Sequence, residues 1–195
     1  MKTQRLIVGV SGASGIIYGM RALQILRELN VETHLVASKA AEMTLNYETD
    51  SSIAEFRGMA DQVYKMPDVG ASIASGSFRT MGMLIAPCSV RTMSEIAAGV
   101  TSSLLTRAAD VVLKERRRLV LMVRETPYHL GHIRTMERLT EMGAIICPPL
   151  PAFYTNPKSI EDLVDQSVGR ALDLFDLDWQ DTRRWGEDLE KGRRG

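Results

Sequence analysis

Short apolar runs alternate with longer amphipathic segments along most of this chain. Five runs without polar alternation predict buried β-strands and a weaker run predicts a sixth: 5–10, 32–36, 83–86, 119–123 and 144–147, with 63–65 as the weak one. Apolar residues at helical spacing predict α-helices between and after them: 16–29, 38–47, 92–98, 103–116, 131–142 and 159–175. Fully apolar strands that are each followed by a helix are typical of a parallel sheet with helices on both faces.

Local residue choices support several of these helix boundaries. Ser38 can accept a hydrogen bond as the N-cap of the second helix, and Ser159 with Asp162 can do the same for the last one. Ser52 and Glu55 have the spacing of a capping box and predict a short extra helix. Gly143 is placed to end the helix before it.

The length of 195 residues fits one domain with a small appendage. We expect a single α/β domain over residues 1–177 and a polar tail over 178–195. Trp179 and Trp185 interrupt the tail, which suggests that it docks on another surface, such as a neighbouring subunit.

The charge balance limits the possible partners. The 24 basic residues equal the 24 acidic ones, whereas a protein that coats nucleic acid carries a basic excess. The apolar run near the N-terminus breaks after Val10, and no run approaches the roughly 20 residues of a membrane span. The two cysteines, Cys88 and Cys147, are too few for a disulfide framework. We therefore expect a cytoplasmic protein that binds neither nucleic acid nor membrane.

Ligands of open α/β sheets bind beyond the carboxyl ends of the strands, where strand order reverses. The loop after the first strand, GVSGASG at 9–15, is built from small residues that let a ligand approach the backbone and the following helix N-terminus. Its glycines are not spaced as in the dinucleotide fingerprint, and no acidic residue follows the second strand. The pattern argues against NAD and favours a mononucleotide phosphate, with a tight turn that binds nothing as the alternative.

Two further loop segments carry candidate chemistry. Ser89 and Thr92 can reach a ligand or only cap the next helix, and Cys88 between them and the strand is expected to be a buried residue rather than a nucleophile. Arg124 and Glu125 directly follow an apolar strand, as a structural ion pair or as a catalytic pair.

Other charged or metal-binding candidates have simpler explanations. Arg107 and Lys114 share one helix face, which is also compatible with a solvated surface. His129 and His132 could share a metal, but no further ligand stands at the usual spacing, so a role at the helix start is favoured.

Eight segments, in order, resemble the UbiX-type flavin prenyltransferases: VGVSGASG (8–15), SKAA (38–41), ETD (48–50), ASGS (74–77), PCS (87–89), RAADVVLKERR (107–117), VRETP (123–127) and PAFY (151–154). The match extends from about residue 4 to Trp185. It implies a three-layer Rossmann/flavodoxin-like fold with six parallel strands in the order 3-2-1-4-5-6. In that order the loops at 11–15 and 87–92 face each other.

The resemblance also implies an activity. Family members join a dimethylallyl group from dimethylallyl phosphate to N5 and C6 of reduced FMN, without a metal, and the prenylated FMN serves UbiD-type decarboxylases. Residues that match flavin-binding positions are Gly12, Ala13, Ser14, Ser38, Ser89, Val90, Arg91, Thr92 and Arg124. Residues that match the prenyl-phosphate site are Ser75, Arg107, Lys114, Arg124, Glu125, Tyr154 and Arg170.

Ser14, Glu48 and Glu125 match catalytic positions. Ser14 and Glu48 would relay protons near flavin N5, and Glu125 would protonate the departing phosphate or hold Arg124. The family suggests a homododecamer with sites shared between subunits. Two rival functions remain at this stage: an FMN-dependent aromatic-acid decarboxylase and a non-catalytic flavin carrier. The sequence leaves open a monophosphate or a pyrophosphate donor, and a role in ubiquinone synthesis or in aromatic-acid breakdown.

Overall fold

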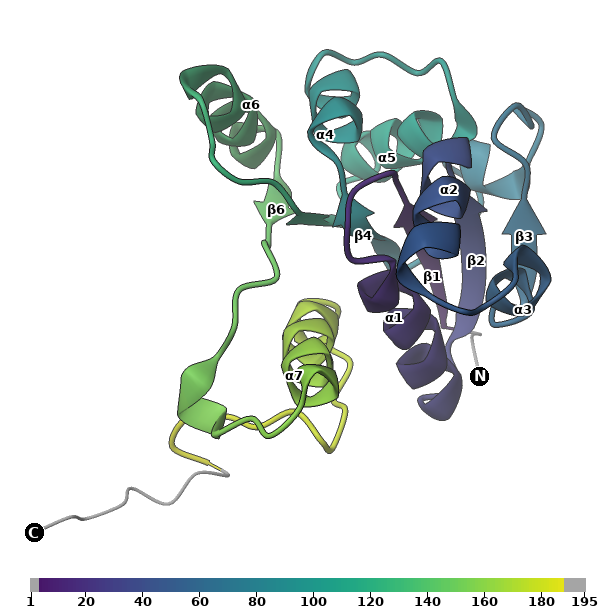
Figure 1. Cartoon of the computed structure of the whole chain (residues 1–195). Helices are drawn as coiled ribbons and strands as arrows, with labels where there is room; N and C mark the ends of the chain where they lie inside the picture. The colour runs from purple at the N-terminus through teal and green to yellow at the C-terminus, as the bar shows by residue number, and fades with distance from the viewer. Residues whose placement is uncertain (1–3, 188–195) are drawn as a thin grey trace, which may run out of the picture.

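The computed structural model describes residues 4–187 and contains one six-stranded parallel sheet in the order β3-β2-β1-β4-β5-β6 (Figure 1). This confirms the expected fold and strand order. The strands are β1 (Arg5–Val10), β2 (Glu32–Ala37), β3 (Gln62–Tyr64), β4 (Gly82–Cys88), β5 (Arg118–Val123) and β6 (Ala144–Ile146). The helices are α1 (Ile16–Glu28), α2 (Lys39–Glu48), α3 (Ile53–Arg57), α4 (Val90–Ala97), α5 (Leu104–Lys114), α6 (Leu130–Glu141) and α7 (Ile160–Asp173), with 3₁₀ turns η1 (Ser72–Ala74) and η2 (Phe153–Thr155).

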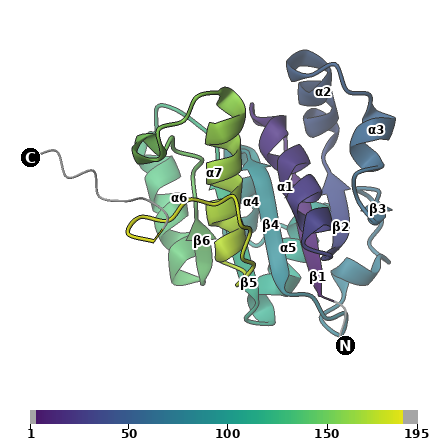
Figure 2. The same ribbon diagram turned by 90° about the horizontal axis from the view of Figure 1, so that it is seen from below.

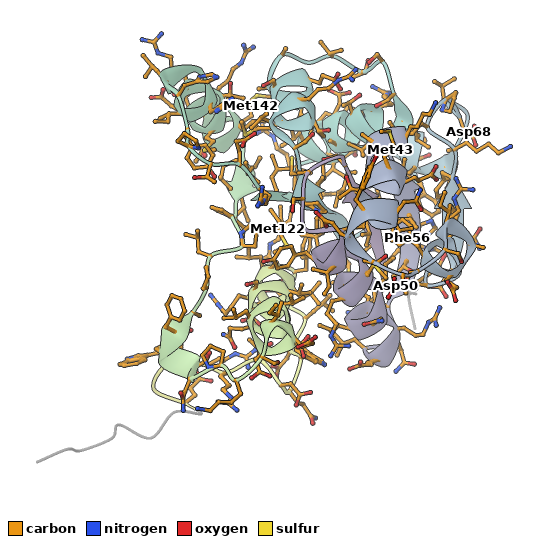
Figure 3. All side chains as sticks on the ribbon, viewed as in Figure 1. Met43, Asp50, Phe56, Asp68, Met122 and Met142 are labelled. Carbon is orange, nitrogen blue, oxygen red and sulfur yellow. The ribbon has the colours of Figure 1, made fainter. Side chains whose placement is uncertain are left out.

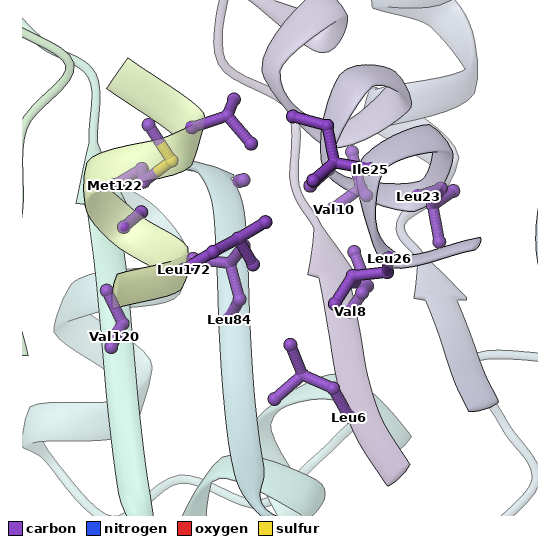
Figure 4. Packing of buried hydrophobic residues seen from close by; sticks show 14 of the residues in the cluster. Leu6, Val8, Val10, Leu23, Ile25, Leu26, Leu84, Val120, Met122 and Leu172 are labelled. Atoms are coloured by element: carbon purple, nitrogen blue, oxygen red, sulfur yellow. The ribbon is translucent and has the colours of Figure 1, made fainter. Parts of the chain in front are cut away.

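Successive residues of each central strand supply opposite faces of the sheet, so two apolar layers form. On one face, Leu84 and Val120 pack against α1 and α7, and Met122 lies beside α7 (Figures 3 and 4). On the other face, Met83 and Leu121 pack against α4 and α5. In the second view α7 and α1 lie side by side over the sheet (Figure 2). Burial on both faces explains why the strands carry no polar alternation.

Several boundaries differ from the sequence prediction. Strand β4 continues through Pro87 to Cys88 instead of ending at Ala86, with a register shift in its pairing with β5 between Ile85 and Cys88. Proline has no N–H to donate, so the ladder is interrupted there before Cys88 pairs with Val123. Helix α4 starts at Val90 rather than at residue 92, because Ser89 is its N-cap. Helices α5 and α7 end two residues earlier than predicted.

The predicted polar tail lies against its own chain as far as residue 187. The buried Trp179 ring packs with α1 and α7, its Nε1–H donates to Glu28 Oε2 at 2.9 Å, and the Arg21 guanidinium lies 5.1 Å from its centre. The expectation of a neighbouring subunit as its docking surface is therefore wrong for Trp179, because the apolar surface of α1 and α7 receives it. Trp185 stays 70% exposed. Residues 188–195 of the tail lie outside the described residues.

Within residues 4–187, none of the helices combines the length and apolarity that a bilayer-crossing segment requires.

Candidate active site

The loops after β1 and β4 are tied together by one buried side chain. Ser11 donates its hydroxyl to the Pro87 carbonyl at 3.0 Å and accepts the Ser89 N–H at 2.7 Å. Because β1 and β4 are neighbours in the sheet, the two loops lie at the point where strand order reverses. The expected meeting of these loops is confirmed.

A cavity of about 480 Å³ opens between these loops and the start of α5. Its lining includes Glu125 and every residue that matched a flavin-binding position. The flavin-matched residues are Gly12, Ala13, Ser14, Ser38, Ser89, Val90, Arg91, Thr92 and Arg124. The volume lies within the range of ordinary small-molecule sites, about 300–1,000 Å³. The residues that the sequence predicted to bind flavin therefore all line one cavity.

Two helix N-termini border the cavity. Ser38 accepts the Ala41 N–H at 3.1 Å as the N-cap of α2, and Ser89 accepts the Thr92 N–H at 3.2 Å as the N-cap of α4. The capping role expected of Ser38 and Ser89 is confirmed, whereas Thr92 supplies the backbone N–H that Ser89 caps. The first backbone N–H groups of a helix and its dipole attract anions, so this part of the cavity is suited to a phosphate group.

The first loop leaves no room for a larger side chain beside α2. A Cβ on Gly12 would lie 2.3 Å from the Ala40 Cβ, far inside van der Waals contact. At the other end of the loop, Gly15 has a φ of 101°, a conformation that L-amino acids rarely adopt. These two glycines let the backbone at Ala13 and Ser14 form the cavity wall.

Glu48 lies behind this loop rather than in the cavity wall. It is the last residue of α2, and its Oε2 accepts the N–H groups of Gly15 at 2.8 Å and Ile16 at 3.0 Å. The carboxylate thus caps the N-terminus of α1, one residue after Ser14. These two hydrogen bonds hold the Glu48 carboxylate of α2 against the loop that carries Ser14.

Arg124 and Glu125 follow β5 at the cavity edge. Glu125 Oε1 accepts the Thr126 N–H at 2.9 Å, and among residues 4–187 no ion pair joins Arg124 to Glu125. The structural-ion-pair alternative for these two residues is therefore wrong. Arg124 lies near Tyr18, whose pKa is raised by burial and partly lowered again by the guanidinium charge. Both residues line the cavity.

The other residues that were predicted to bind the prenyl phosphate do not line this cavity within one chain. Ser75 and Lys114 lie together, since both flank Gly76: Ser75 Oγ is 2.9 Å from Ser77 Oγ, and a Cβ on Gly76 would lie 2.8 Å from Lys114 Nζ. Lys114 is paired with Glu115. Arg107 lies seven residues earlier on α5, about 10 Å along the helix axis, and contacts Asp110 at 2.7 Å.

Tyr154 and Arg170 lie on two further elements. Tyr154 lies on η2, where its ring makes an edge contact with Trp185 at a centroid distance of 5.5 Å. Arg170 lies on α7 and pairs with Asp173. Apart from Glu48, the predicted site residues outside the cavity thus lie after η1, on α5, on η2 and on α7.

The cysteine and histidine candidates have structural roles. Cys88 is fully buried, and burial raises the pKa of its thiol to about 12, so it is not a nucleophile at neutral pH. His129 is the N-cap of α6 and accepts the N–H groups of Gly131 and His132 through Nδ1. Within the described range, His, Cys, Asp and Glu side chains do not gather in groups that could hold a metal ion.

Sequence reasoning missed other parts of the cavity wall. Lys39 and Ala40 begin α2 directly after Ser38, and Met66 with Ser103 and Thr106 closes the side next to α5. Lys39 could have been found, because it follows Ser38 in one of the matched segments. Met66 carried no signal, since it lies in an irregular segment after the short β3.

Comparison with known proteins agrees with this geometry. The flavoprotein family model matches residues 1–172. The flavin prenyltransferase UbiX of Thauera aromatica is 56% identical over 96% of each chain, and that of Escherichia coli K12 is 58% identical over 88% of this chain and 92% of the relative. This chain belongs to the UbiX-type flavin prenyltransferases. The membership confirms the resemblance first seen in the eight sequence segments.

Solved structures of the family have the same fold. The structure of AnUbiX (PadA1) in complex with FMN and dimethylallyl pyrophosphate has a TM-score of 0.93 and 53% identity, covering 94% of this chain and 98% of that one. A dodecameric FMN-dependent Ubix-like decarboxylase from Escherichia coli O157:H7 has a TM-score of 0.91 and 48% identity, covering 93% and 99%.

The residues of this chain fit the family's flavin. The cavity has the volume of a small-molecule site, the α4 N-terminus is suited to the phosphate, and the glycine-bordered loop at Gly12 exposes backbone where a planar ring can approach closely. The side chains that surround it supply hydroxyl and guanidinium donors, from Ser14 and Arg124 among others. This donor set suits a polar heterocycle and a phosphate.

Proposed function

We propose that this protein transfers a dimethylallyl group from dimethylallyl phosphate to N5 and C6 of reduced FMN. The bond between the allylic carbon and the phosphate oxygen breaks, phosphate leaves, and the allylic carbon bonds to N5. The prenyl double bond then takes up one proton while its other carbon bonds to C6, and the hydrogens originally on N5 and C6 leave as protons. Reduced FMN supplies the electron-rich positions. The chain's own residues must bind both molecules, accept the protons and stabilise the departing phosphate.

On the flavin side, we assign binding to the cavity and proton movement to Ser14 and Glu48. The N-terminus of α4, with Ser89 and Thr92, would hold the FMN phosphate. Ser14 lies in the cavity wall and Glu48 contacts the backbone of the next two residues. A hydroxyl beside a carboxylate is a suitable path for a proton that leaves the flavin.

On the donor side, we assign phosphate binding to Arg107, Lys114, Arg124 and Arg170 with the hydroxyls of Ser75 and Tyr154. Several cations around a phosphate stabilise the negative charge that grows as the allylic bond breaks. Glu125 would protonate the departing phosphate. The Tyr154 ring would face the positive charge on the prenyl group.

We infer that these donor groups meet only in an assembly of several copies. In one chain, the proposed donor-binding residues other than Arg124 lie outside the cavity, after η1, on α5, on η2 and on α7: Ser75, Arg107, Lys114, Tyr154 and Arg170. The dodecameric relative supports a homo-oligomer, and we propose a dodecamer in which each cavity is completed by neighbouring subunits.

One observation carries the proposal: the same cavity is lined by the flavin-binding residues and by Arg124 and Glu125. A plain flavin carrier needs neither a proton path at Glu48 nor exposed cations outside the flavin cavity. A decarboxylase that uses ordinary FMN needs one cation for a carboxylate, not four.

The test is to incubate the protein anaerobically with reduced FMN and dimethylallyl phosphate, and in parallel with the pyrophosphate. We expect a new flavin absorption spectrum together with donor-dependent release of the leaving group, which is inorganic phosphate from the monophosphate or pyrophosphate from the pyrophosphate. Decarboxylation of an aromatic acid without any prenyl donor would favour the decarboxylase. FMN binding without phosphate release from either donor would favour the carrier.

We further propose that the prenylated FMN leaves for a UbiD-type decarboxylase, and that both steps occur in the cytoplasm. Activation of an apo-decarboxylase by the reaction mixture, but not by the same mixture without donor, tests the transfer. Failure of activation by chemically verified prenylated FMN from this protein would contradict it.

A further inference from the structure

The described part of the tail, residues 178–187, forms what we call the C-terminal strap. It is anchored at one end by the buried Trp179 between α1 and α7. Further along, Thr182 lies against α7 where Gly169 leaves space for it: a Cβ on Gly169 would lie 2.0 Å from the Thr182 Oγ1. The strap therefore has a fixed path over α7 rather than a loose surface contact.

A buried glutamine fixes the strap's backbone at Arg183. Gln166, on α7 and only 5% exposed, donates its Nε2–H to the Arg183 carbonyl at 2.9 Å and accepts the Arg183 N–H through Oε1 at 3.1 Å. The side-chain amide thus pairs with a backbone residue as a strand neighbour would. A buried, doubly satisfied amide of this kind is costly to disrupt, since either lost bond leaves a buried polar group unpaired.

The residue held in this way reaches across to η2. Arg183 Nη1 donates to the Thr155 carbonyl at 2.7 Å, directly after Tyr154. Two residues further along the strap, Trp185 contacts the Tyr154 ring edge to face at 5.5 Å. The strap and the turn are therefore joined by one hydrogen bond, from the Arg183 side chain to the Thr155 carbonyl, and by one aromatic ring contact.

Thr155 is buried, but the two aromatic residues of the turn have few other contacts. Phe153 is 75% exposed and Tyr154 is 45% exposed, and the turn's own hydrogen bonds, such as the Thr155 hydroxyl to the Ala152 carbonyl at 2.7 Å, fix its local shape but not its place on the protein. The chain from β6 to α7 spans this region in an extended path (Figure 1). The position of Tyr154 is thus set mainly by the strap.

We propose that Gln166 and Arg183 are positioning residues for the prenyl-donor side of the site. Gln166 fixes Arg183, Arg183 fixes the Thr155 carbonyl, and the turn then presents Tyr154 in one place. This assignment rests on the proposed function, because Tyr154 is placed at the donor site only there. It predicts that disrupting this chain of contacts impairs turnover without impairing FMN binding.

The test compares Arg183→Ala, Arg183→Lys and, as a matched control on the exposed side of the strap, Gln180→Ala. We expect Arg183→Ala to lower kcat for prenyl transfer about tenfold, the weight of one charge-assisted hydrogen bond to a neutral carbonyl. FMN affinity should not change. Arg183→Lys keeps a donor for the Thr155 carbonyl and should restore most of the rate. Gln180→Ala should behave as the wild type.

A double-mutant cycle separates positioning from general weakening of the fold. If Arg183 acts through Tyr154, the double variant Arg183→Ala/Tyr154→Ala should be less than twofold slower than Tyr154→Ala alone. Fully additive losses would overturn the proposal. Gln166→Glu, which retains the acceptor and loses the donor, should produce an intermediate loss.

Hydrogen exchange supplies a readout that does not depend on activity. Backbone amides of residues 152–156 should exchange faster in Arg183→Ala than in the wild type, with no change in Gln180→Ala. Equal exchange in all three proteins would refute the positioning role, whatever the kinetics. Wild-type protein that transfers no prenyl group would instead refute the proposed function, while the exchange result still decides whether Arg183 holds the turn.

Discussion

Removal of the Ser11 hydroxyl tests whether the two loops that form the cavity depend on their shared hydrogen bonds. The side chain is 1% exposed and links the Pro87 carbonyl to the Ser89 N–H. In Ser11→Ala the Pro87 carbonyl keeps a second donor, the Ser11 backbone N–H at 3.1 Å. The Ser89 N–H loses the partner that Ser11 provides, so this N–H determines how much unfolding free energy the substitution removes.

The expected loss follows from that single orphaned donor. A buried unsatisfied N–H costs about 1–3 kcal/mol of unfolding free energy. For a chain of this size, that corresponds to a fall in Tm of roughly 2–12 °C. Because Ser89 starts α4, whose N-terminus we assign to the FMN phosphate, FMN affinity should also fall, by up to about tenfold.

Thermal unfolding and FMN titration of Ser11→Ala measure both effects. Thr140→Ala is the matched control, because it also removes a hydroxyl that donates to a carbonyl, at an exposed position on α6. We expect the control to change neither Tm nor affinity measurably. An unchanged Tm and unchanged FMN affinity in Ser11→Ala would refute the view that this contact holds the cavity together.

Three further predictions address chemistry and pH. Glu48→Gln should lower prenyl transfer by roughly 100-fold or more while FMN still binds, since it removes a proton acceptor; unchanged turnover would leave Glu48 only as the cap of α1. Lys114→Ala should mainly raise the KM for dimethylallyl phosphate, with partial rescue at high donor concentration; a loss of kcat alone would place Lys114 in the chemical step instead. Burial lowers the pKa of His34, so the unfolded chain binds a proton more readily than the folded protein. The contribution of neutral His34 to the free energy of unfolding should therefore be fully present above the pKa of the unfolded chain, near 6.5, and should decrease as pH falls below it. Urea unfolding between pH 7.5 and 5.5 checks this, and a His34→Gln variant with the same pH dependence would contradict it.

The parts of the fold that could be predicted were those set by local pattern. After their first residue, the runs in β1 and β5 are apolar because both faces of the sheet are covered, and Ser38, Ser52 and Ser159 mark helix starts through their own hydrogen bonds. The extension of β4 through Pro87 could not be predicted, since proline usually ends a strand and only the neighbouring β5 allows the pairing at Cys88.

The candidate site divides in the same way. Gly12, Ser14 and Ser89 could be found because loops after strands of a parallel sheet converge, and the structure brings them to one cavity. The contact of Glu48 with Gly15 joins residues far apart in sequence and had no local signal beyond the resemblance. The role of Gln166 depends on the path of the strap, which no periodicity in a polar tail reveals.

The most direct test of the central claim is the mass of the flavin after reaction with a deuterium-labelled donor. The protein, reduced FMN and labelled dimethylallyl phosphate are incubated anaerobically, and the flavin is then extracted and analysed by mass spectrometry. Our account predicts a flavin that has gained one labelled prenyl unit, formed only when protein and donor are both present. Recovery of unmodified FMN from the complete mixture, with the donor intact, would contradict it.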